Sequence, residues 1–258
     1  MEIKDDIWTP DNTIILGYRG SIAHNMYIPN TDPNSVDDID LMGVYLANVD
    51  HYIGIEQGKQ TIEKFTTYDD VLYDMVHYEL VKFVKLMLNA NPNVLGLLWL
   101  RPEYYPRLSE YGEILVSNKR LFSSKKAYKS FTGYAFSQLL KMEKYNHEGY
   151  MGEKRKALVE KYGYDCKNAS HCIRLLKMGT EFLSSGELNV FRDDAETLLE
   201  IKRGEWTLDQ VKAEADRLFK LADEAYAKSK LPDEPDYAEV NRIVRGILFE
   251  YVASWRCR

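Results

Sequence analysis

Two aspartates separated by one residue stand directly in front of a strongly apolar stretch of the chain. Asp38 and Asp40 lead into the sequence LMGVYL, and the run 39–47 is predicted to form a buried β-strand. Side chains alternate along a strand, so Asp38 and Asp40 face one side, while Asp37 drops out as a loop or flanking residue. Two carboxylates that share one space repel each other unless a cation lies between them. The chain therefore has to build a buried strand whose open end holds a positive charge.

Magnesium is the cation that this arrangement favours. Carboxylate oxygens are hard ligands, and Mg²⁺ commonly shares its coordination shell with substrate phosphates. A third carboxylate on a neighbouring strand would complete a site for two metal ions. We assign this role to Asp74, because the segment 71–79 has the β-branched and aromatic residues of a strand, whereas Asp69 and Asp70 look more like loop residues. The alternative for the aspartate pair is a solvated surface turn, and the apolar segment behind Asp40 argues against it.

A glycine–serine step earlier in the chain is a candidate phosphate site. Gly20 and Ser21 follow residues 13–18, which are predicted to form a strand, and the segment 20–26 is expected to turn and begin a helix. Glycine lets a phosphate approach the backbone, the serine can donate hydrogen bonds to it, and the helix N-terminus adds a positive dipole end. A Gly–Ser step alone is a weak signal, and the aspartate pair after it strengthens this one.

The sequence after residue 80 is dominated by the apolar repeat of helices. One helical face carries Leu80, Phe83, Val84, Met87 and Leu88, and Pro92 is placed to open a second helix. The same periodicity predicts helices over residues 125–146, 152–162, 165–185, 194–203, 207–229 and 237–253. We therefore predict an α+β fold in which a small mixed β-sheet domain, residues 1–115, is followed by a mainly α-helical C-terminal domain, residues 116–258.

Composition narrows the class of protein. The 258 residues are 45% hydrophobic, which is ample for a core, and contain neither a long apolar run nor a signal-peptide pattern at the N-terminus. Three cysteines without a CxxC pair form neither a disulfide framework nor a zinc pattern. The net charge of −6 argues against broad nonspecific binding of nucleic acid. We expect a soluble, intracellular protein.

Several separate segments, in order, resemble one superfamily. The Gly20–Ser21 step, the Asp38-x-Asp40 strand and a later acidic strand resemble the nucleotidyltransferase superfamily that includes DNA polymerase beta. The chain looks most like the "predicted nucleotidyltransferase" branch of bacteria and their phages. The resemblance covers nearly the whole chain, through KFVKLMLNANPNVLGLLW (82–99), SKKAYKSFTGYAFSQLLKM (124–142), KNASHCIRLLKMGTEFLSSGELNV (167–190), IKRGEW (201–206) and SKLPDEPD (229–236).

The resemblance implies a palm-type catalytic domain with a helical C-terminal region. The implied activity moves an NMP from an NTP to an acceptor hydroxyl and releases pyrophosphate. Asp38, Asp40 and Asp74 would be the catalytic residues and would bind two Mg²⁺ ions, with Mn²⁺ as an alternative. Asp74 is then either the general base or a metal ligand only. RNA, a protein and a small molecule all remain open as acceptors, no membrane partner is expected, and the expected location is the cytoplasm of a bacterium or a phage-infected cell.

A basic face is predicted on the helix that begins near residue 165. Lys167, His171 and Arg174 lie at positions i, i+4 and i+7, so they share a face that could bind the triphosphate or the transferred base. A solvated helix face is the alternative: periodicity alone favours it, and the resemblance brings the two near even. Lys82 is a further candidate for a phosphate contact. An equally weighted alternative is that its aliphatic stem packs on the core while its amine reaches solvent.

The chain departs from the superfamily pattern in two places. Ser21 precedes Asp38 by 17 positions, several more than is usual for the superfamily. The extra residues YIPNTDPNS (27–35) are expected to form a loop beside the site, and this loop is where we expect the acceptor to be selected. Gly96 stands where many members have glutamate.

Two other functions compete with transfer. One is a non-catalytic nucleotide-binding regulatory protein, or the partner of a toxin or defence protein, although the presence of all three carboxylates speaks against it. The other is an RNase in the helical half, but His147 and His171 lack the arginine five positions earlier that one helical RNase family requires.

Overall fold

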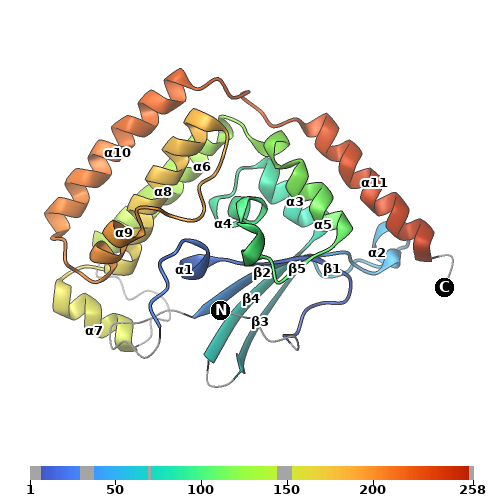
Figure 1. Ribbon diagram of the computed structural model, residues 1–258, viewed down its shortest axis with the longest axis horizontal. Coiled ribbons are helices and arrows are strands. Elements are labelled where there is room, and N and C mark those ends of the chain that lie inside the picture. Colours follow the sequence, from blue (N-terminus) through green and yellow to red (C-terminus); the bar gives the residue numbers. More distant parts are fainter. Residues whose placement is uncertain (1–6, 30–37, 69–70, 144–152, 256–258) are drawn as a thin grey trace.

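A five-stranded mixed sheet lies at the base of the molecule (Figure 1). The computed structural model describes residues 7–29, 38–68, 71–143 and 153–255. The strand order is β3-β4-β2-β1-β5. The strands are β1 (Thr13–Tyr18), β2 (Ile39–Tyr45), β3 (Thr61–Tyr68), β4 (Val71–Glu79) and β5 (Arg107–Leu108). The strands predicted over 13–18, 39–47 and 71–79 are thus present.

The pairing of β2 with β4 decides where the carboxylates lie. These two strands run parallel, whereas β1 pairs antiparallel with β2 and β5, and β3 pairs antiparallel with β4. The register sets Asp40 opposite Asp74 and Tyr45 opposite Glu79. Because paired residues in a parallel sheet face the same side, Asp40 and Asp74 project from one face as direct neighbours.

The central and edge strands differ as their sequences suggest. Every residue of β2 except Asp40 is buried, in keeping with its continuous apolar sequence. The edge strand β3 is half-buried or exposed along its whole length and mixes charged with apolar residues. Charged side chains on an edge strand oppose pairing with other chains. For this reason β3 gave no strand signal in the sequence.

Helices form the rest of the molecule. Those in the first half are α1 (Gly20–Ala23), α2 (Val49–Ile53), α3 (Leu80–Leu88), α4 (Pro92–Leu95) and α5 (Glu110–Ser117), with short 3₁₀ turns η1 (Gly96–Trp99), η2 (Pro102–Tyr104) and η3 (Lys119–Phe122). Those in the second half are α6 (Lys126–Glu143), α7 (Glu153–Tyr162), α8 (Cys166–Ser185), α9 (Ala195–Lys202), α10 (Leu208–Lys228) and α11 (Tyr237–Trp255). These six match the helices predicted from periodicity.

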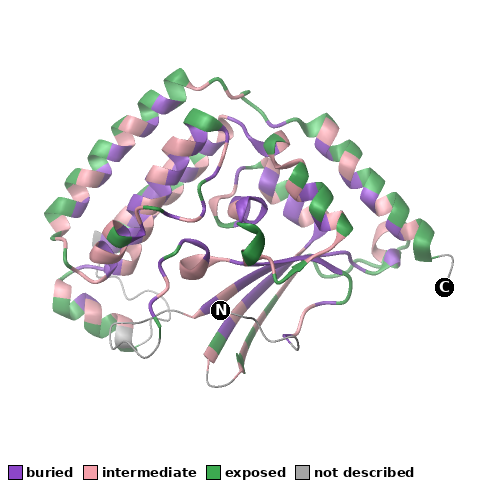
Figure 2. Ribbon diagram, in the orientation of Figure 1, coloured by how far each residue is buried: buried purple, intermediate pink, exposed green. Residues whose placement is uncertain are grey.

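Most of the helices pack on one side of the sheet, and α10 and α11 are the outermost of them (Figure 1). α8 packs against α6, α9 and α10, while α11 returns toward the sheet and packs against α2 and α3. Figure 2 shows the consequence: buried residues follow the strands and the inner faces of the helices, and exposed residues follow the outer faces of α10 and α11. α8 is therefore the central helix of the second half.

Local signals fix several helix ends. Glu79 ends β4 and caps α3, because its carboxylate accepts hydrogen bonds from the amides of Val81 and Lys82. Thr207 and Gln210 form a reciprocal capping box at the start of α10. Gly186 ends α8 in the left-handed conformation, with φ of +76°. The chain turns there into the segment 186–194, which runs back along α8.

The hydrophobic core is continuous from Ile7 to Tyr251 and includes buried residues on both sides of residue 115. The division into domains at that residue stays a prediction. Among the described residues, no helix is long and apolar enough to span a membrane.

Candidate active site

The site is centred on two carboxylates that share one arginine. Asp40 in β2 and Asp74 in β4 are register neighbours. The guanidinium of Arg19, in the turn between β1 and α1, lies 2.9 Å from Asp74 Oδ2 and 3.6 Å from Asp40 Oδ1. The Arg19 amide also donates a hydrogen bond to the Asp40 carbonyl, at 3.0 Å. The end of β1 is thereby attached to the start of β2 beside the carboxylates.

Asp40 lies in an environment that resists its ionisation. Burial raises its pKa to about 6; the positive charges of Arg19 and Lys167 oppose this rise, and the negative charges of Asp74 and Asp38 add to it. Asp38, directly before β2, is half-buried. The structure thus brings the charges of all three predicted aspartates close together. Asp37, Asp69 and Asp70 lie outside the described residues, as does most of the loop 27–35.

Gly20 makes the turn over Asp40 possible. Its φ is +60°, and a Cβ added there would lie 2.0 Å from Asp40 Oδ2. Only a glycine allows this conformation and this approach at low cost. α1 has only four residues, so the positive dipole end expected at its N-terminus is weak. The hydroxyl of Ser21 and the Nε of Arg19 are buried without a hydrogen-bond partner among the described residues.

We expect Gly20→Ala to destabilise the protein by about 1–2 kcal/mol, because a methyl group at positive φ is strained and meets the Asp40 carboxylate. Thermal unfolding measures this loss. Gly133→Ala is the matched control: Gly133 is exposed within α6 and its added Cβ has open space, so it should stabilise the helix by about 0.5–1 kcal/mol. A Gly20→Ala variant as stable as the wild type would contradict the close approach.

A cavity of about 140 Å³ joins the sheet to α8. Arg19, Gly20 and Asp40 line its sheet side, and His171 and Arg174 line its α8 side. Burial and the charges of Arg174 and Lys167 hold the pKa of His171 well below its usual value, so its ring is neutral near pH 7. Its ring meets that of Tyr134 edge to face, with centroids 5.2 Å apart. Two residues of the predicted basic face, His171 and Arg174, therefore line the same cavity as Asp40. The third, Lys167, lies close enough to Asp40 for its charge to lower the pKa of that carboxyl.

Gly96 lines the same cavity, next to Val190. Position 96, where many members of the superfamily have glutamate, therefore brings no carboxylate to the cavity in this chain.

The structure does not bring Lys82 to this site. Lys82 follows Glu79, the residue paired with Tyr45 at the end of β2 opposite to Asp40. The five residue steps from Asp40 to Tyr45 span about 17 Å of strand. Lys82 is half-buried in the first turn of α3, and its amide donates to Glu79.

Sequence reasoning missed Arg19 and His24. Arg19 directly precedes the Gly–Ser step, and a cation at that position was the available signal. His24, at the end of α1, is buried. One of its ring nitrogens is hydrogen-bonded to the Val190 carbonyl and the other to Arg174. Its partners lie about 150 positions or more further along the chain, so no local pattern could reveal its role.

The site has the donor chemistry for a divalent metal ion. Asp40 and Asp74 offer hard oxygen ligands from one face, and Asp38 adds negative charge nearby. Arg19 competes with any metal ion for these oxygens, because its guanidinium already contacts both. As the side chains stand, no three Asp, Glu, His or Cys residues of the described chain are grouped to hold a metal.

The comparison with protein families decides the broader assignment. Residues 31–246, more than three quarters of the chain, match the RNA repair pathway DNA polymerase beta family (RlaP). The chain belongs to this family. The match confirms the predicted membership of the polymerase beta-like nucleotidyltransferases. It includes all three aspartates and α8 but begins after the Gly20–Ser21 turn, so the family assignment does not depend on that turn.

The crystal structure of a nucleotidyltransferase-like protein from Exiguobacterium sibiricum matches 83% of this chain and 70% of its own, with 13% identity and a TM-score of 0.30. No curated protein matches the sequence significantly.

Proposed function

We propose that the protein is a metal-dependent nucleotidyltransferase that moves an NMP from an NTP to an acceptor hydroxyl. The observation that carries the proposal is the parallel register of β2 and β4. It sets Asp40 beside Asp74, under a glycine turn whose buried Ser21 hydroxyl has no partner among the described residues. A buried polar group without a partner in a native structure needs an explanation, and a bound phosphate oxygen supplies one here.

The residues divide into two groups by chemistry. Asp38, Asp40 and Asp74 would hold Mg²⁺ or Mn²⁺, which supplies charge neutralisation at the phosphate and a lower pKa of the acceptor hydroxyl. Gly20, Ser21, Lys167, His171 and Arg174 would contact the nucleotide. Lys82 is left out of this second group because of its position at the other end of the sheet.

The reaction is a substitution at the α-phosphorus. The acceptor oxygen bonds to that phosphorus, the bond from it to the bridging oxygen of the β-phosphate breaks, and pyrophosphate leaves with the bonding electrons. The acceptor hydroxyl gives up its proton. Asp74 is the carboxylate that we assign to this proton or to the orientation of the hydroxyl, because the backbone of Gly20 closes over Asp40 Oδ2.

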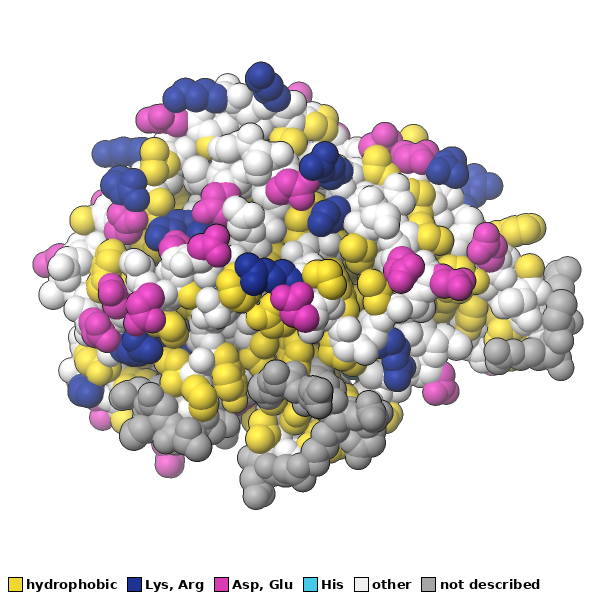
Figure 3. Space-filling view, viewed as in Figure 1, with side chains coloured by type: hydrophobic (Ala, Val, Ile, Leu, Met, Phe, Trp, Pro, Cys, Tyr) yellow, Lys and Arg dark blue, Asp and Glu magenta, His cyan; other side chains and the backbone are white. Residues whose placement is uncertain are grey.

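An RNA end is the acceptor that we favour over a protein or a small molecule. The description of the family names an RNA repair pathway. The surface argues for an end rather than a long duplex: positive and negative side chains are interspersed on the face shown in Figure 3. A cluster of lysine and arginine residues at positions 119–129 is also largely neutralised, since Arg120, Lys125 and Lys126 pair with Glu187, Asp233 and Glu234.

Label transfer tests the proposal. The protein is incubated with Mg²⁺ and each α-³²P-labelled NTP, together with RNA that ends in a 3′-hydroxyl, the same RNA with a blocked 3′ end, a lysate protein fraction and a small-molecule fraction. We expect label on the RNA with the free hydroxyl and release of pyrophosphate. A matched γ-³²P-labelled NTP should transfer no label, which separates NMP transfer from phosphorylation.

Other outcomes would redirect the assignment. Label on protein or small molecules would keep the reaction and change the acceptor. NTP binding without pyrophosphate release across all acceptors would favour the nucleotide-binding regulatory protein instead.

A further inference from the structure

The cavity beside Asp40 contains a positive charge that the protein does not neutralise. Arg174, on α8, is directed toward His24 Nε2 and lies 3.5 Å from Met178 Sδ. Among the described residues, no carboxylate lies within ion-pair distance of its guanidinium. The other partly or fully buried arginines of this region differ, since Arg155 and Arg192 are each bonded to carboxylates. Enclosing a cation without a counter-ion is costly, so this arrangement suits an anionic ligand.

The surroundings of Arg174 increase the positive potential. Burial and the charge of Arg192 lower the pKa of Arg174 to about 10, which leaves the guanidinium charged near pH 7. His171, the other polar residue on this wall, is neutral there. The remaining wall beside Arg174 is apolar and includes Leu175 and Val190. Low polarity around a cation strengthens its attraction for an anion.

His24 determines how Arg174 presents its donors. The Nδ1 of His24 lies 2.7 Å from the Val190 carbonyl, which can only accept, so Nδ1 carries the ring proton. The Nε2 atom is then the acceptor for one N–H of Arg174. Burial and the charge of Arg174 keep the pKa of His24 well below its usual value, in agreement with this neutral tautomer. One guanidinium nitrogen is thus held by the fixed ring of His24 and by Met178 Sδ, and the donors on the other two nitrogens are available to a ligand.

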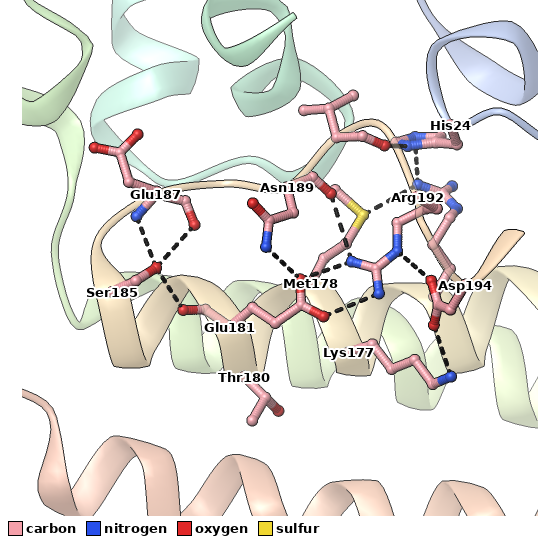
Figure 4. A network of polar contacts seen from close by, with 12 residues as sticks. His24, Lys177, Met178, Thr180, Glu181, Ser185, Glu187, Asn189, Arg192 and Asp194 are labelled. Atoms are coloured by element: carbon pink, nitrogen blue, oxygen red, sulfur yellow. Dashed lines mark hydrogen bonds and ion pairs between the residues drawn. The ribbon is translucent and has the colours of Figure 1, made fainter.

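The segment 186–194 holds His24 in turn. Figure 4 shows this segment along α8, where Arg192 is bonded to Glu181 and Asp194, and Lys177 is bonded to Asp194. Val190, which accepts from His24, lies within this segment. The ion pairs between this segment and α8 therefore hold the Val190 carbonyl in place, and that carbonyl in turn orients His24.

We propose that Arg174 is the receptor for the terminal phosphate of the NTP and that His24 is the positioning residue that orients it. This inference rests on the proposed function and specifies which part of the substrate this wall binds. Asp40, on the sheet, and Arg174, on α8, lie on opposite walls of one cavity. An extended triphosphate meets both walls, with its reacting phosphate near Asp40 and its terminal phosphate at Arg174. A nucleobase fits the position less well, because it brings no negative charge to the guanidinium.

Binding of inorganic tripolyphosphate in the presence of Mg²⁺ tests this inference without turnover. We expect His24→Leu to weaken binding about tenfold and Arg174→Met about 100-fold, as one to two charge-assisted hydrogen bonds are lost. His24→Gln keeps an acceptor for Arg174 and a donor for Val190, so it should bind within about threefold of the wild type. In the Arg174→Met background, His24→Leu should have little further effect, because the two residues act as a unit.

His77→Leu is the matched control for loss of a buried histidine. His77 lies on the opposite face of β4 from Asp74 and has no hydrogen-bond partner among the described residues, so tripolyphosphate affinity should not change. If His24→Leu does not fold, Arg174→Lys replaces it. It keeps the charge but lacks the planar fork that holds His24 and an anion in fixed directions, so a loss of about tenfold is expected.

Three results would overturn the inference: unchanged affinity in the folded His24 and Arg174 variants, no tripolyphosphate binding by the wild type, or binding of adenosine in place of tripolyphosphate. The proposed transfer reaction is judged separately. A protein that transfers label while these variants bind normally refutes the anion receptor alone. A protein that shows the expected affinities but transfers no label refutes the transferase alone.

Discussion

Asp40→Asn should abolish nucleotidyl transfer while making the folded protein more stable at neutral pH. We expect activity to fall by at least about 1000-fold, because the variant loses the charged oxygen at the centre of the site. Stability should change in the other direction. Burial raises the pKa of Asp40 to about 6, above the value of about 3.9 for an unfolded aspartate. The wild type therefore pays for a buried charge that asparagine does not carry.

The sign of the pH dependence follows from the two pKa values. Between about pH 4 and pH 6 the folded state retains a proton that the unfolded chain has released, so wild-type stability falls as the pH rises through this window. At pH 7.5 we expect Asp40→Asn to gain about 2 kcal/mol, or roughly 6 °C in Tm. At pH 4 the gain should vanish.

Thermal unfolding at the two pH values, together with the label-transfer assay, measures both effects. Asp50→Asn is the control, because Asp50 is an exposed carboxylate in α2, and neither activity nor Tm should change. Full transfer activity in Asp40→Asn would show that the Asp40 carboxylate takes no part in the transfer reaction. An equal Tm difference at pH 4 and pH 7.5 would show that burial does not raise the pKa of this carboxyl.

The sequence predicted the elements of the site better than their arrangement. β1, β2 and β4 were predictable because they are apolar or β-branched and are buried, while β3 was not, since an exposed edge strand has no such pattern. The alternation of side chains placed Asp38 and Asp40 on one side. Only the parallel register, which depends on a crossover through β3, makes Asp74 the neighbour of Asp40.

The residues that sequence reasoning missed or misplaced all depend on distant contacts. Helical periodicity placed Lys167, His171 and Arg174 in one helix, which the structure shows as α8, because spacing along one helix is a local property. Lys82 was assigned to the carboxylates without knowledge of strand direction, and the sheet places it at the other end. His24 acquires a role only when α8 and the segment 186–194 pack against α1, and periodicity within one element contains no such information.

Arg192→Met should produce the largest loss of stability among these variants. The Arg192 side chain is only 5% exposed and bonds Glu181 and Asp194 at 2.7–2.9 Å. Methionine fills similar space but leaves Glu181 without this partner and Asp194 with Lys177 alone. Breaking such a pair costs about 3 kcal/mol at pH 7, which corresponds to a Tm lower by roughly 8 °C. Arg217→Met is the control: it removes an exposed pair with Glu214 on α10, and Tm should not change measurably.

Acid should reduce the difference in stability between Arg192→Met and the wild type. Burial alone would raise the pKa of Asp194, but hydrogen bonds from Arg192 and Lys177 lower it to about 2. A depressed pKa stabilises the fold above about pH 3.9 and loses this effect as the pH falls toward 2. The unfolding midpoints of the variant and the wild type should therefore lie closer together at pH 2.5 than at pH 7. An equal difference at both pH values would mean that the variant loses packing rather than a charge interaction. Because Arg192 also holds the segment that carries Val190, the same variant at pH 7 should weaken tripolyphosphate binding, whereas a purely structural ion pair would leave that affinity unchanged.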